Sequence, residues 1–219
     1  MKTESVLEKV IASGNLAVTS ECGPPRGSSS EKIIEKAKML QGYVDAVNVT
    51  DNQTAMVRMS SFAACVFIKQ LGMSPILQMV TRDRNRIGIQ SDILGAASFG
   101  IHNILCLTGD HQHFGDHPQA INVFDLDSTQ LIQTVKLMRD EGQLLGGFEM
   151  KELPNMFIGA AANPLPILLK FGCPAWPKRW RPVASSFRPS ASTTWKSSRP
   201  GCSRFATRDC TRRWPSLQA

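Results

Sequence analysis

Short apolar segments alternate with longer amphipathic ones along most of the chain. The apolar segments predict β-strands over residues 16–20, 44–49, 75–80, 103–107 and 156–162. Between them, apolar residues at helical spacing predict helices over residues 33–40, 58–71, 86–99 and 128–141. Strands that are apolar on both faces, each followed by a helix, are typical of a parallel α/β sheet covered by helices. The unit length of roughly 25 to 30 residues suits a (β/α)₈ TIM barrel, and a doubly wound sheet fits nearly as well.

This alternation stops near Pro164, where the composition of the chain also changes. Residues 1–163 contain 14 Lys and Arg against 17 Asp and Glu, whereas residues 164–219 contain 11 against one acid and all four Trp. The formal charge is therefore −3 in the first part and +10 in the second. Beyond Leu169 no strand or helix period is sustained. We expect an incomplete barrel of about five βα units, the regular part (1–163), followed by a disordered basic tail (164–219).

The sequence also bears on where in the cell the protein is expected and on the state of its cysteines. No apolar run reaches the roughly 18 residues of a membrane-spanning helix. The N-terminus passes directly into an amphipathic stretch rather than a signal sequence, so we expect a cytoplasmic protein without a membrane partner. Cys22, Cys65 and Cys106 are far apart and form no CxxC motif, which favours reduced thiols over disulfides or a zinc site.

Polar residues gather where each predicted strand ends. They are Glu21, then Thr50, Asp51, Asn52 and Gln53, then Gln78, Thr81, Arg82 and Asp83, then Thr108, Gly109 and Asp110, and finally Asn163. Parallel strands present their carboxyl ends at one edge of a sheet, so the pattern predicts a shared ligand site there. The alternative at each single position is an ordinary turn residue. Glu21 is the exception, because a carboxylate against a buried strand needs a partner or a role.

No glycine-rich phosphate motif accompanies these strands. Neither GxGxxG nor GxxxxGK[ST] is present, which argues against a dinucleotide-binding Rossmann fold and against a P-loop enzyme.

Four strand-end segments together resemble the methylenetetrahydrofolate reductase family. They are SECGPPR (20–26), VNVTDN (47–52), QMVTRD (78–83) and LCLTGD (105–110), and their order and spacing over residues 1–163 are specific although no single segment is decisive. The resemblance implies a flavin-containing (β/α)₈ barrel that passes a hydride through FAD. The implied reaction reduces methylenetetrahydrofolate to methyltetrahydrofolate in one-carbon metabolism.

The resemblance also implies two catalytic carboxylates. Glu21 matches the family's general acid toward the folate, and a half-buried carboxyl with a raised pKa suits the protonation that opens the five-membered ring. Asp110 matches an Asp that hydrogen-bonds the pterin and tunes the flavin.

The same comparison predicts a flavin-binding set. Its members are Thr50, Asp51, Gln78, Thr108, Gly109, Asp110, Phe124 and Asn163. Gln78 stands where some members have His, Thr108 where some have Arg, and Phe124 where a Tyr often covers the cofactor. These departures indicate a distinct branch of the family, whose electron donor is NAD(P)H or a partner flavoprotein or ferredoxin. A homo-oligomer and a hetero-oligomer both remain open.

The loop after residue 107 contains a dense group of His111, His113, Asp116 and His117. Such spacing is one that transition metals use. We favour a loop that closes over the folate and expect no metal, because the family needs none.

The tail is interpreted as the product of a shifted reading frame. Read from the third base of each codon, residues 166–171 can encode Asp-Pro-Phe-Glu-Ile, and Phe187 begins a stretch that can encode Gln-Thr-Gln. The family uses a Gln-Thr-Gln segment to contact folate and nicotinamide, so we expect a truncated and inactive reductase. The alternative is a genuine basic tail that binds nucleic acid through Arg and Trp. A third hypothesis is a flavin-free pterin methyltransferase barrel.

Overall fold

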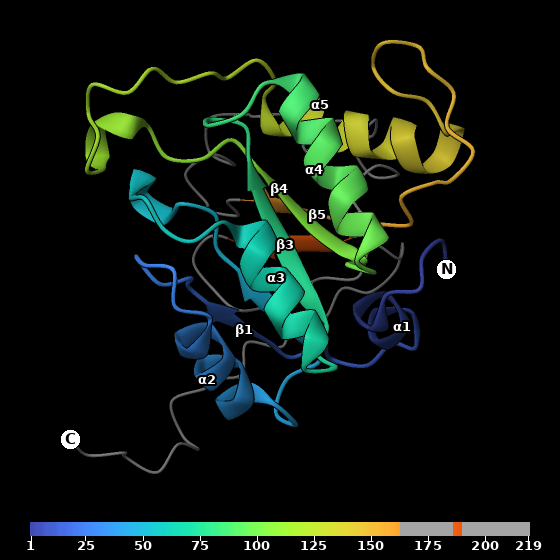
Figure 1. The fold of residues 1–219 in the computed structure, drawn as a ribbon. Coiled ribbons are helices and arrows are strands. Elements are labelled where there is room, and N and C mark those ends of the chain that lie inside the picture. Colours follow the sequence, from blue (N-terminus) through green and yellow to red (C-terminus); the bar gives the residue numbers. More distant parts are fainter. Residues whose placement is uncertain (163–185, 190–219) are drawn as a thin grey trace, which may run out of the picture.

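Helices and strands alternate through the computed structural model, which describes residues 1–162 and 186–189 (Figure 1). The strands are β1 (Thr19–Cys22), β2 (Ala46–Val49), β3 (Pro75–Val80), β4 (Asn103–Leu107), β5 (Phe157–Ala162) and β6 (Ser186–Pro189). The α-helices are α1 (Val6–Ala12), α2 (Ser30–Leu40), α3 (Ser61–Gln70), α4 (Arg86–Ser98) and α5 (Ser128–Lys136). Two 3₁₀ turns, η1 (Gln53–Ala55) and η2 (Gln112–Phe114), lie in loops, and the π-helix η3 (Leu137–Glu141) extends α5.

The strand order decides between the two folds that the sequence left open. The strands form one sheet in the order β1-β2-β3-β4-β5-β6, and every neighbouring pair is parallel. A doubly wound sheet reverses its order at a switch point, whereas the strands of a (β/α)₈ barrel follow the chain around its wall. The described sheet is therefore a section of barrel wall, with β1 and β6 at its two ends.

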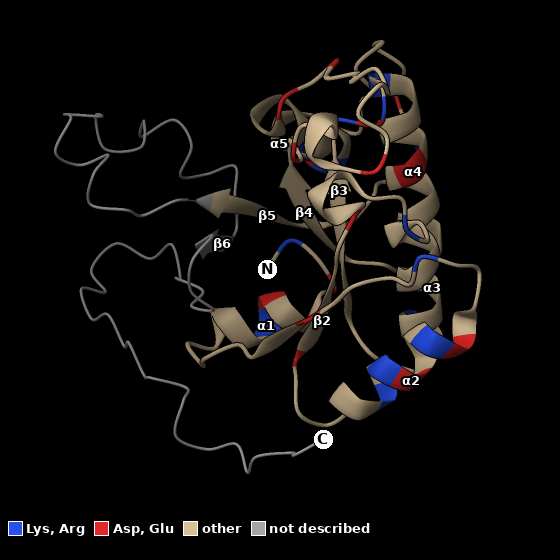
Figure 2. Ribbon diagram, turned by 90° about the vertical axis from the view of Figure 1, so that its left-hand side faces the viewer, with Lys and Arg blue, Asp and Glu red and all other residues tan. Residues whose placement is uncertain are grey.

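Two apolar layers cover the two faces of the sheet. On one face, α2 to α5 pack against side chains such as Val47, Leu77 and Ile104. On the other face, which we call the inner face because a closed barrel would enclose it, Leu7 of α1 packs with Ile76 and Phe157. Figure 2 shows α1 on the opposite side of the strands from α2, α3 and α4. Helix α1 therefore covers part of the inner face and leaves the carboxyl ends of the strands to the loops.

The sixth strand corrects the sequence prediction. Only five strands and a tail without regular structure are expected, yet residues 186–189 pair with β5, with Gly159 opposite Ser186 and Ala162 opposite Pro189. The ladder of a sheet is formed by main-chain groups, so the unpaired edge of β5 accepts an extended segment whose side chains carry no strand pattern. The expectation of disorder is wrong at these four residues, and the remainder of the tail lies outside the described residues.

Most predicted boundaries agree with the structure, and β3 and β4 agree at both ends. The first strand begins later than predicted and includes Glu21 and Cys22. Among the described residues, no helix combines the length and apolar content that crossing a membrane requires.

Candidate functional site

The carboxyl ends of β1 to β4 bring most of the predicted site residues to one edge of the sheet. Cys22, Val49, Leu77 and Met79 belong to the core on the helix side. Because side chains alternate along a strand, the neighbouring residues Glu21, Thr50 and Gln78 face the inner side. Asp110 follows the end of β4 at the same edge. The predicted convergence of Glu21, Thr50, Gln78 and Asp110 at one edge therefore agrees with the topology.

Glu21 differs from the expectation in its surroundings. It lies within β1, opposite Asn48 of β2, and it is exposed rather than half-buried.

Two buried side-chain oxygens on the inner face lack a hydrogen-bond partner within the described part of the chain. They are Asn48 Oδ1 and Thr50 Oγ1, in residues that are each 2% exposed. Native proteins pair most of their buried polar atoms, so two orphaned oxygens on alternate residues of one strand mark a place built for a ligand or for water. Gln78, 6% exposed, presents an amide on the adjacent strand.

Asp51 is held by protein groups instead. Its Oδ2 accepts hydrogen bonds from the Val80 amide at 3.1 Å and from Arg84 at 2.7 Å, and its Oδ1 accepts from Arg84 at 3.4 Å. The carboxylate therefore joins the end of β2 to the end of β3 and is not part of the proposed cofactor site.

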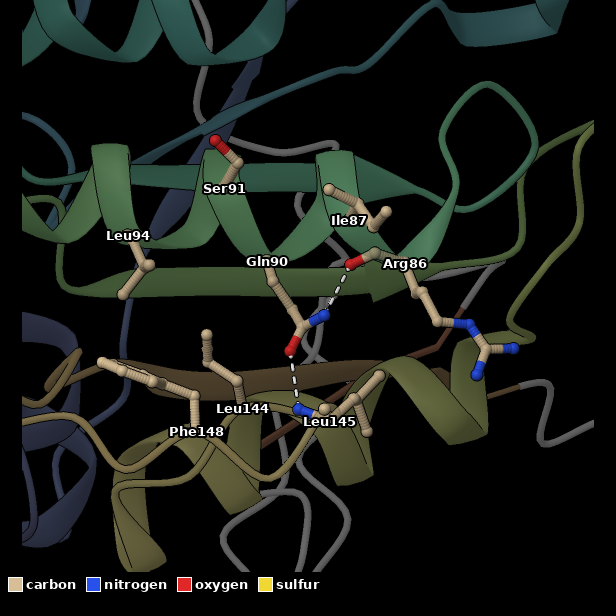
Figure 3. A pocket seen from close by; sticks show the side chains of 9 residues that line it. Arg86, Ile87, Gln90, Ser91, Leu94, Leu144, Leu145 and Phe148 are labelled. Atoms are coloured by element: carbon tan, nitrogen blue, oxygen red, sulfur yellow. Dashed lines mark hydrogen bonds between the residues drawn. The ribbon is translucent and has the colours of Figure 1, made fainter.

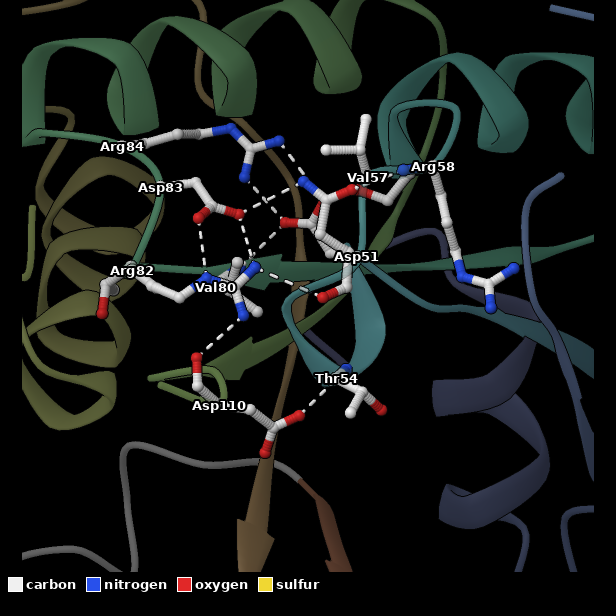
Figure 4. Close-up of polar contacts among 12 residues, drawn as sticks. Asp51, Thr54, Val57, Arg58, Val80, Arg82, Asp83, Arg84 and Asp110 are labelled. Atoms are coloured by element: carbon white, nitrogen blue, oxygen red, sulfur yellow. Dashed lines mark hydrogen bonds and ion pairs between the residues drawn. The ribbon is translucent and has the colours of Figure 1, made fainter. Parts of the chain in front are cut away.

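A buried cation lies at the centre of the edge (Figure 4). The Arg82 side chain is 3% exposed and forms two hydrogen bonds with the Asp83 carboxylate, at 2.7 and 2.6 Å. It also donates to the main-chain carbonyl of Asp110 at 2.9 Å and to that of Asn52 at 3.3 Å. The hydrogen bonds to Asp83 raise the pKa of Arg82 above its ordinary value. Burial raises the pKa of Asp83, but hydrogen bonds from Arg82 and Asn52 outweigh burial and lower it overall.

The loop after β2 reaches the Asp110 carboxylate through a strained turn. Asn52, Thr54 and Ala55 have φ values of 41°, 57° and 56°, a left-handed conformation that is rare for residues other than glycine. The Thr54 amide donates to Asp110 Oδ2 at 3.1 Å (Figure 4). Strained backbone of this kind is often retained at functional sites.

The loop that carries Gly23 and the two prolines after Glu21 is anchored by three donors. Lys36 donates to the Gly23 carbonyl at 3.2 Å, Arg58 to the Pro24 carbonyl at 3.1 Å, and the Met59 amide to the Pro25 carbonyl at 2.8 Å. The chain immediately after Glu21 is therefore held against the loop that follows β2.

The histidine-rich loop is anchored through its aspartate. Asp116 forms an ion pair with Arg26 and accepts from the Val57 amide at 3.2 Å. A Cβ atom on Gly115 would come within 1.9 Å of the Ala55 carbonyl oxygen, so only glycine permits this approach. Within the described ranges, no group of three or more His, Cys, Asp or Glu is arranged to hold a metal ion.

The other predicted flavin-binding residues lie in the loop after β4 or outside the described residues. Thr108 is exposed, and Gly109 has a φ of 91° and would place a Cβ atom 3.1 Å from Val80 Cβ. Phe124 is 39% exposed beside Val123, whose amide donates to the Arg82 carbonyl at 2.8 Å. Asn163 lies outside the described residues.

A separate cavity of about 530 Å³ lies on the helix side, between α4 and the loop that follows η3 (Figure 3). Ile87, Leu94 and Phe148 are among its lining residues, and Gln90 bridges its walls by accepting from the Leu145 amide at 2.8 Å. None of the predicted site residues lines it.

Sequence reasoning missed Asn48 and the central position of Arg82. In the sequence, Arg82 is one of several polar residues after the third strand. A cation two residues after a mostly apolar strand is the available signal, because such a charge must find partners nearby.

The family comparison agrees with this arrangement. A search of curated proteins finds no match to the chain. The family model described as methylenetetrahydrofolate reductase matches residues 6–150, a range that includes all four strand-end segments and ends before the tail. The chain therefore belongs to the methylenetetrahydrofolate reductase family, whose members are oxidoreductases of folate metabolism.

Proposed function

We propose that the regular part is built to reduce methylenetetrahydrofolate to methyltetrahydrofolate with FAD as the cofactor. The observation that carries the proposal is the inner face at the carboxyl edge of the sheet. There Glu21 lies opposite Asn48, and the orphaned oxygens of Asn48 and Thr50 are buried beside it. Family membership supplies the reaction class.

The residues of the inner face fit the flavin. The unpaired buried oxygens of Asn48 and Thr50 are free to accept hydrogen bonds from it, and the Gln78 amide can both donate and accept. Thr108, Gly109 and Phe124 lie in the neighbouring loop, where the partly exposed Phe124 side chain offers a ring for stacking. Bound FAD would supply the hydride relay between the electron donor and the folate.

Glu21 is proposed to hold a proton for the folate nitrogen that is released when the five-membered ring opens. Its carboxyl lies on the inner face at the strand end, where a ligand would cover it. Burial by the bound cofactor and folate would then provide the environment that a general acid needs.

Asp110 is proposed to accept a hydrogen bond from the pterin. One of its oxygens, Oδ2, accepts from the Thr54 amide, which restrains the carboxylate and would leave the second oxygen for the ligand. A fixed acceptor orients the pterin better than a freely rotating side chain does.

The electron donor is proposed to be NAD(P)H or a partner flavoprotein or ferredoxin. Gln78, Thr108 and Phe124 depart from the family's pattern at positions that normally contact the flavin, which leaves both kinds of donor open. Anaerobic mixing with NADH, NADPH or reduced ferredoxin, followed through the flavin absorbance, distinguishes these donors.

We also propose that residues 164–219 are read in a shifted frame. The family match ends at residue 150, and β6 occupies the position of the sixth barrel strand where the shifted frame would read Gln-Thr-Gln. The nucleotide sequence around codons 160–170 tests this directly. A single-base insertion or deletion there supports the proposal, and a continuous frame across related genes contradicts it.

The decisive experiment for function compares the printed chain with a frame-restored chain. The frame-restored chain should be yellow and reduce methylenetetrahydrofolate, and the printed chain should lack this activity. A colourless frame-restored chain that transfers methyl groups from a pterin would favour the methyltransferase alternative. Polyanion binding that falls steeply with salt would favour a genuine nucleic-acid-binding tail.

A further inference from the structure

Stability of the fold alone does not require a buried cation at the position of Arg82. Its guanidinium is almost fully buried, and burying a cation is costly unless all its donors find partners. The partners come from three different loops, because Asp83 follows β3, Asn52 follows β2, and Asp110 follows β4. Because the Arg82 guanidinium binds residues of all three loops, it fixes the positions of these loops relative to one another.

Two of these contacts hold the backbone segments that position the Asp110 carboxylate. Arg82 binds the main-chain carbonyl of Asp110 itself at 2.9 Å. It also binds the carbonyl of Asn52 at 3.3 Å, at the start of the turn whose Thr54 amide reaches Asp110 Oδ2. One guanidinium thus fixes both the residue that carries the carboxylate and the turn that orients it.

The turn needs such support because its backbone is strained. Thr54 is β-branched and has a φ of 57°, a conformation that surrounding contacts must hold in place. The Asn52 side chain adds to the support, since its amide donates to Asp83 at 3.2 Å and its oxygen accepts from the Arg58 amide at 3.1 Å. The Asp83 carboxylate therefore accepts hydrogen bonds from both Arg82 and Asn52.

We propose that Arg82 is a positioning residue that orients the Asp110 carboxylate through the Asn52 to Ala55 turn. The inference rests on the proposed function, in which Asp110 meets the pterin. Arg82 touches no reacting atom itself, and its effect passes through the main chain of Asn52 and Asp110.

The protein contains a matched control for this role. Arg139 is 4% exposed, forms two hydrogen bonds with the adjacent Asp140, and donates to the main-chain carbonyl of Met156 at 3.1 Å. Its chemistry resembles that of Arg82, but it lies in η3 and contacts the residue that precedes β5, at the opposite end of that strand from the carboxyl edge. A change of Arg139→Lys reports the general cost of replacing a buried guanidinium.

The test uses the full printed chain and nuclear magnetic resonance of the Thr54 amide. Arg82→Lys keeps the charge but loses the planar fork, so its ammonium cannot serve all three loops at once. We expect the Thr54 amide signal to shift and its hydrogen exchange to accelerate by roughly 10- to 100-fold, as for a lost charge-assisted hydrogen bond. Arg139→Lys should leave both properties of Thr54 unchanged.

A double-mutant cycle separates positioning from general loosening. In an Asp110→Ala background the acceptor of Thr54 is gone, so Arg82→Lys should add little further acceleration. If Arg82→Lys does not fold, the Asp83→Asn variant is used instead. Asp83 is more exposed than Arg82, and its replacement weakens the hydrogen bonds that hold the Arg82 guanidinium. An unchanged Thr54 amide in a folded Arg82 or Asp83 variant overturns the proposal, as does an equal effect in the Asp110→Ala background. Absence of folate reduction in the frame-restored chain would instead count against the proposed function, and the Thr54 readout does not depend on it.

Discussion

Glu21 is the residue on which the proposed chemistry depends most directly. For a frame-restored chain, Glu21→Gln should leave FAD bound and lower the rate of methylenetetrahydrofolate reduction by about 10² to 10⁴, the usual range for loss of a general acid. Reduction of the flavin by the electron donor should continue, because that step needs no proton from Glu21. Stopped-flow measurement of the two half-reactions checks both expectations.

The matched control is Glu31→Gln, the same chemical change in the exposed first turn of α2. It should leave both half-reactions at the parental rate. A Glu21→Gln variant that reduces the folate as fast as the parent would show that another group donates the proton.

Helix α1 covers the part of the inner face that lies away from the carboxyl ends of the strands. Leu7 is 1% exposed against the sheet, whereas the adjacent Val6 is 49% exposed. Leu7→Ala should lower the free energy of unfolding by about 2 to 5 kcal/mol through lost burial and the cavity that remains. Val6→Ala should change it far less. Urea unfolding of both variants tests whether α1 packs on the sheet, and equal effects would contradict the described packing.

Helix α5 begins with a complete capping box. Asp127 accepts from the Gln130 amide, and the Gln130 side chain accepts from the Asp127 amide in return. Asp127→Ala should cost about 1 kcal/mol of stability, the usual value for a lost N-cap. Ser29→Ala at the start of α2 is the control, because the Ser29 side chain makes no capping hydrogen bond. Thermal unfolding of the two variants should differ accordingly, and similar losses would refute a capping role for Asp127.

At the scale of the whole molecule, paired carboxylates link separate segments and make stability depend on pH. Hydrogen bonds from Arg86 lower the pKa of Asp125 to about 2. Hydrogen bonds from the adjacent Arg139 and from the distant Lys2 likewise lower the pKa of Asp140. The unfolded chain binds protons to these groups at higher pH than the folded chain does, so their contribution is complete above about pH 4 and is lost toward pH 2. Stability should therefore fall with acid through this range.

Unfolding measured from pH 5 to pH 2 should show a smaller fall in Asp125→Asn than in the parent. Added salt should narrow the difference, since Arg86 and Asp125 are both solvent-accessible. Parallel curves for the two proteins at low salt would mean that the Arg86 pair does not contribute.

The sequence by itself determined the alternation of strands and helices, the extent of β3 and β4, and the change of composition at Pro164. These features follow from local periodicity and local charge, which the order of residues records directly. The strand-end clustering also predicted that these polar residues share one edge of the sheet, because all carboxyl ends of parallel strands meet there.

Only the tertiary structure decided the rest. Asp51 and Arg82 both follow buried strands, but Asp51 accepts from Arg84 while Arg82 binds carbonyls of two other loops. The exposure of Glu21 and the pairing of β6 depend equally on segments distant along the chain. Hydrogen-bond partners, burial and edge pairing are relations between remote residues, and a periodicity confined to neighbouring residues does not specify them.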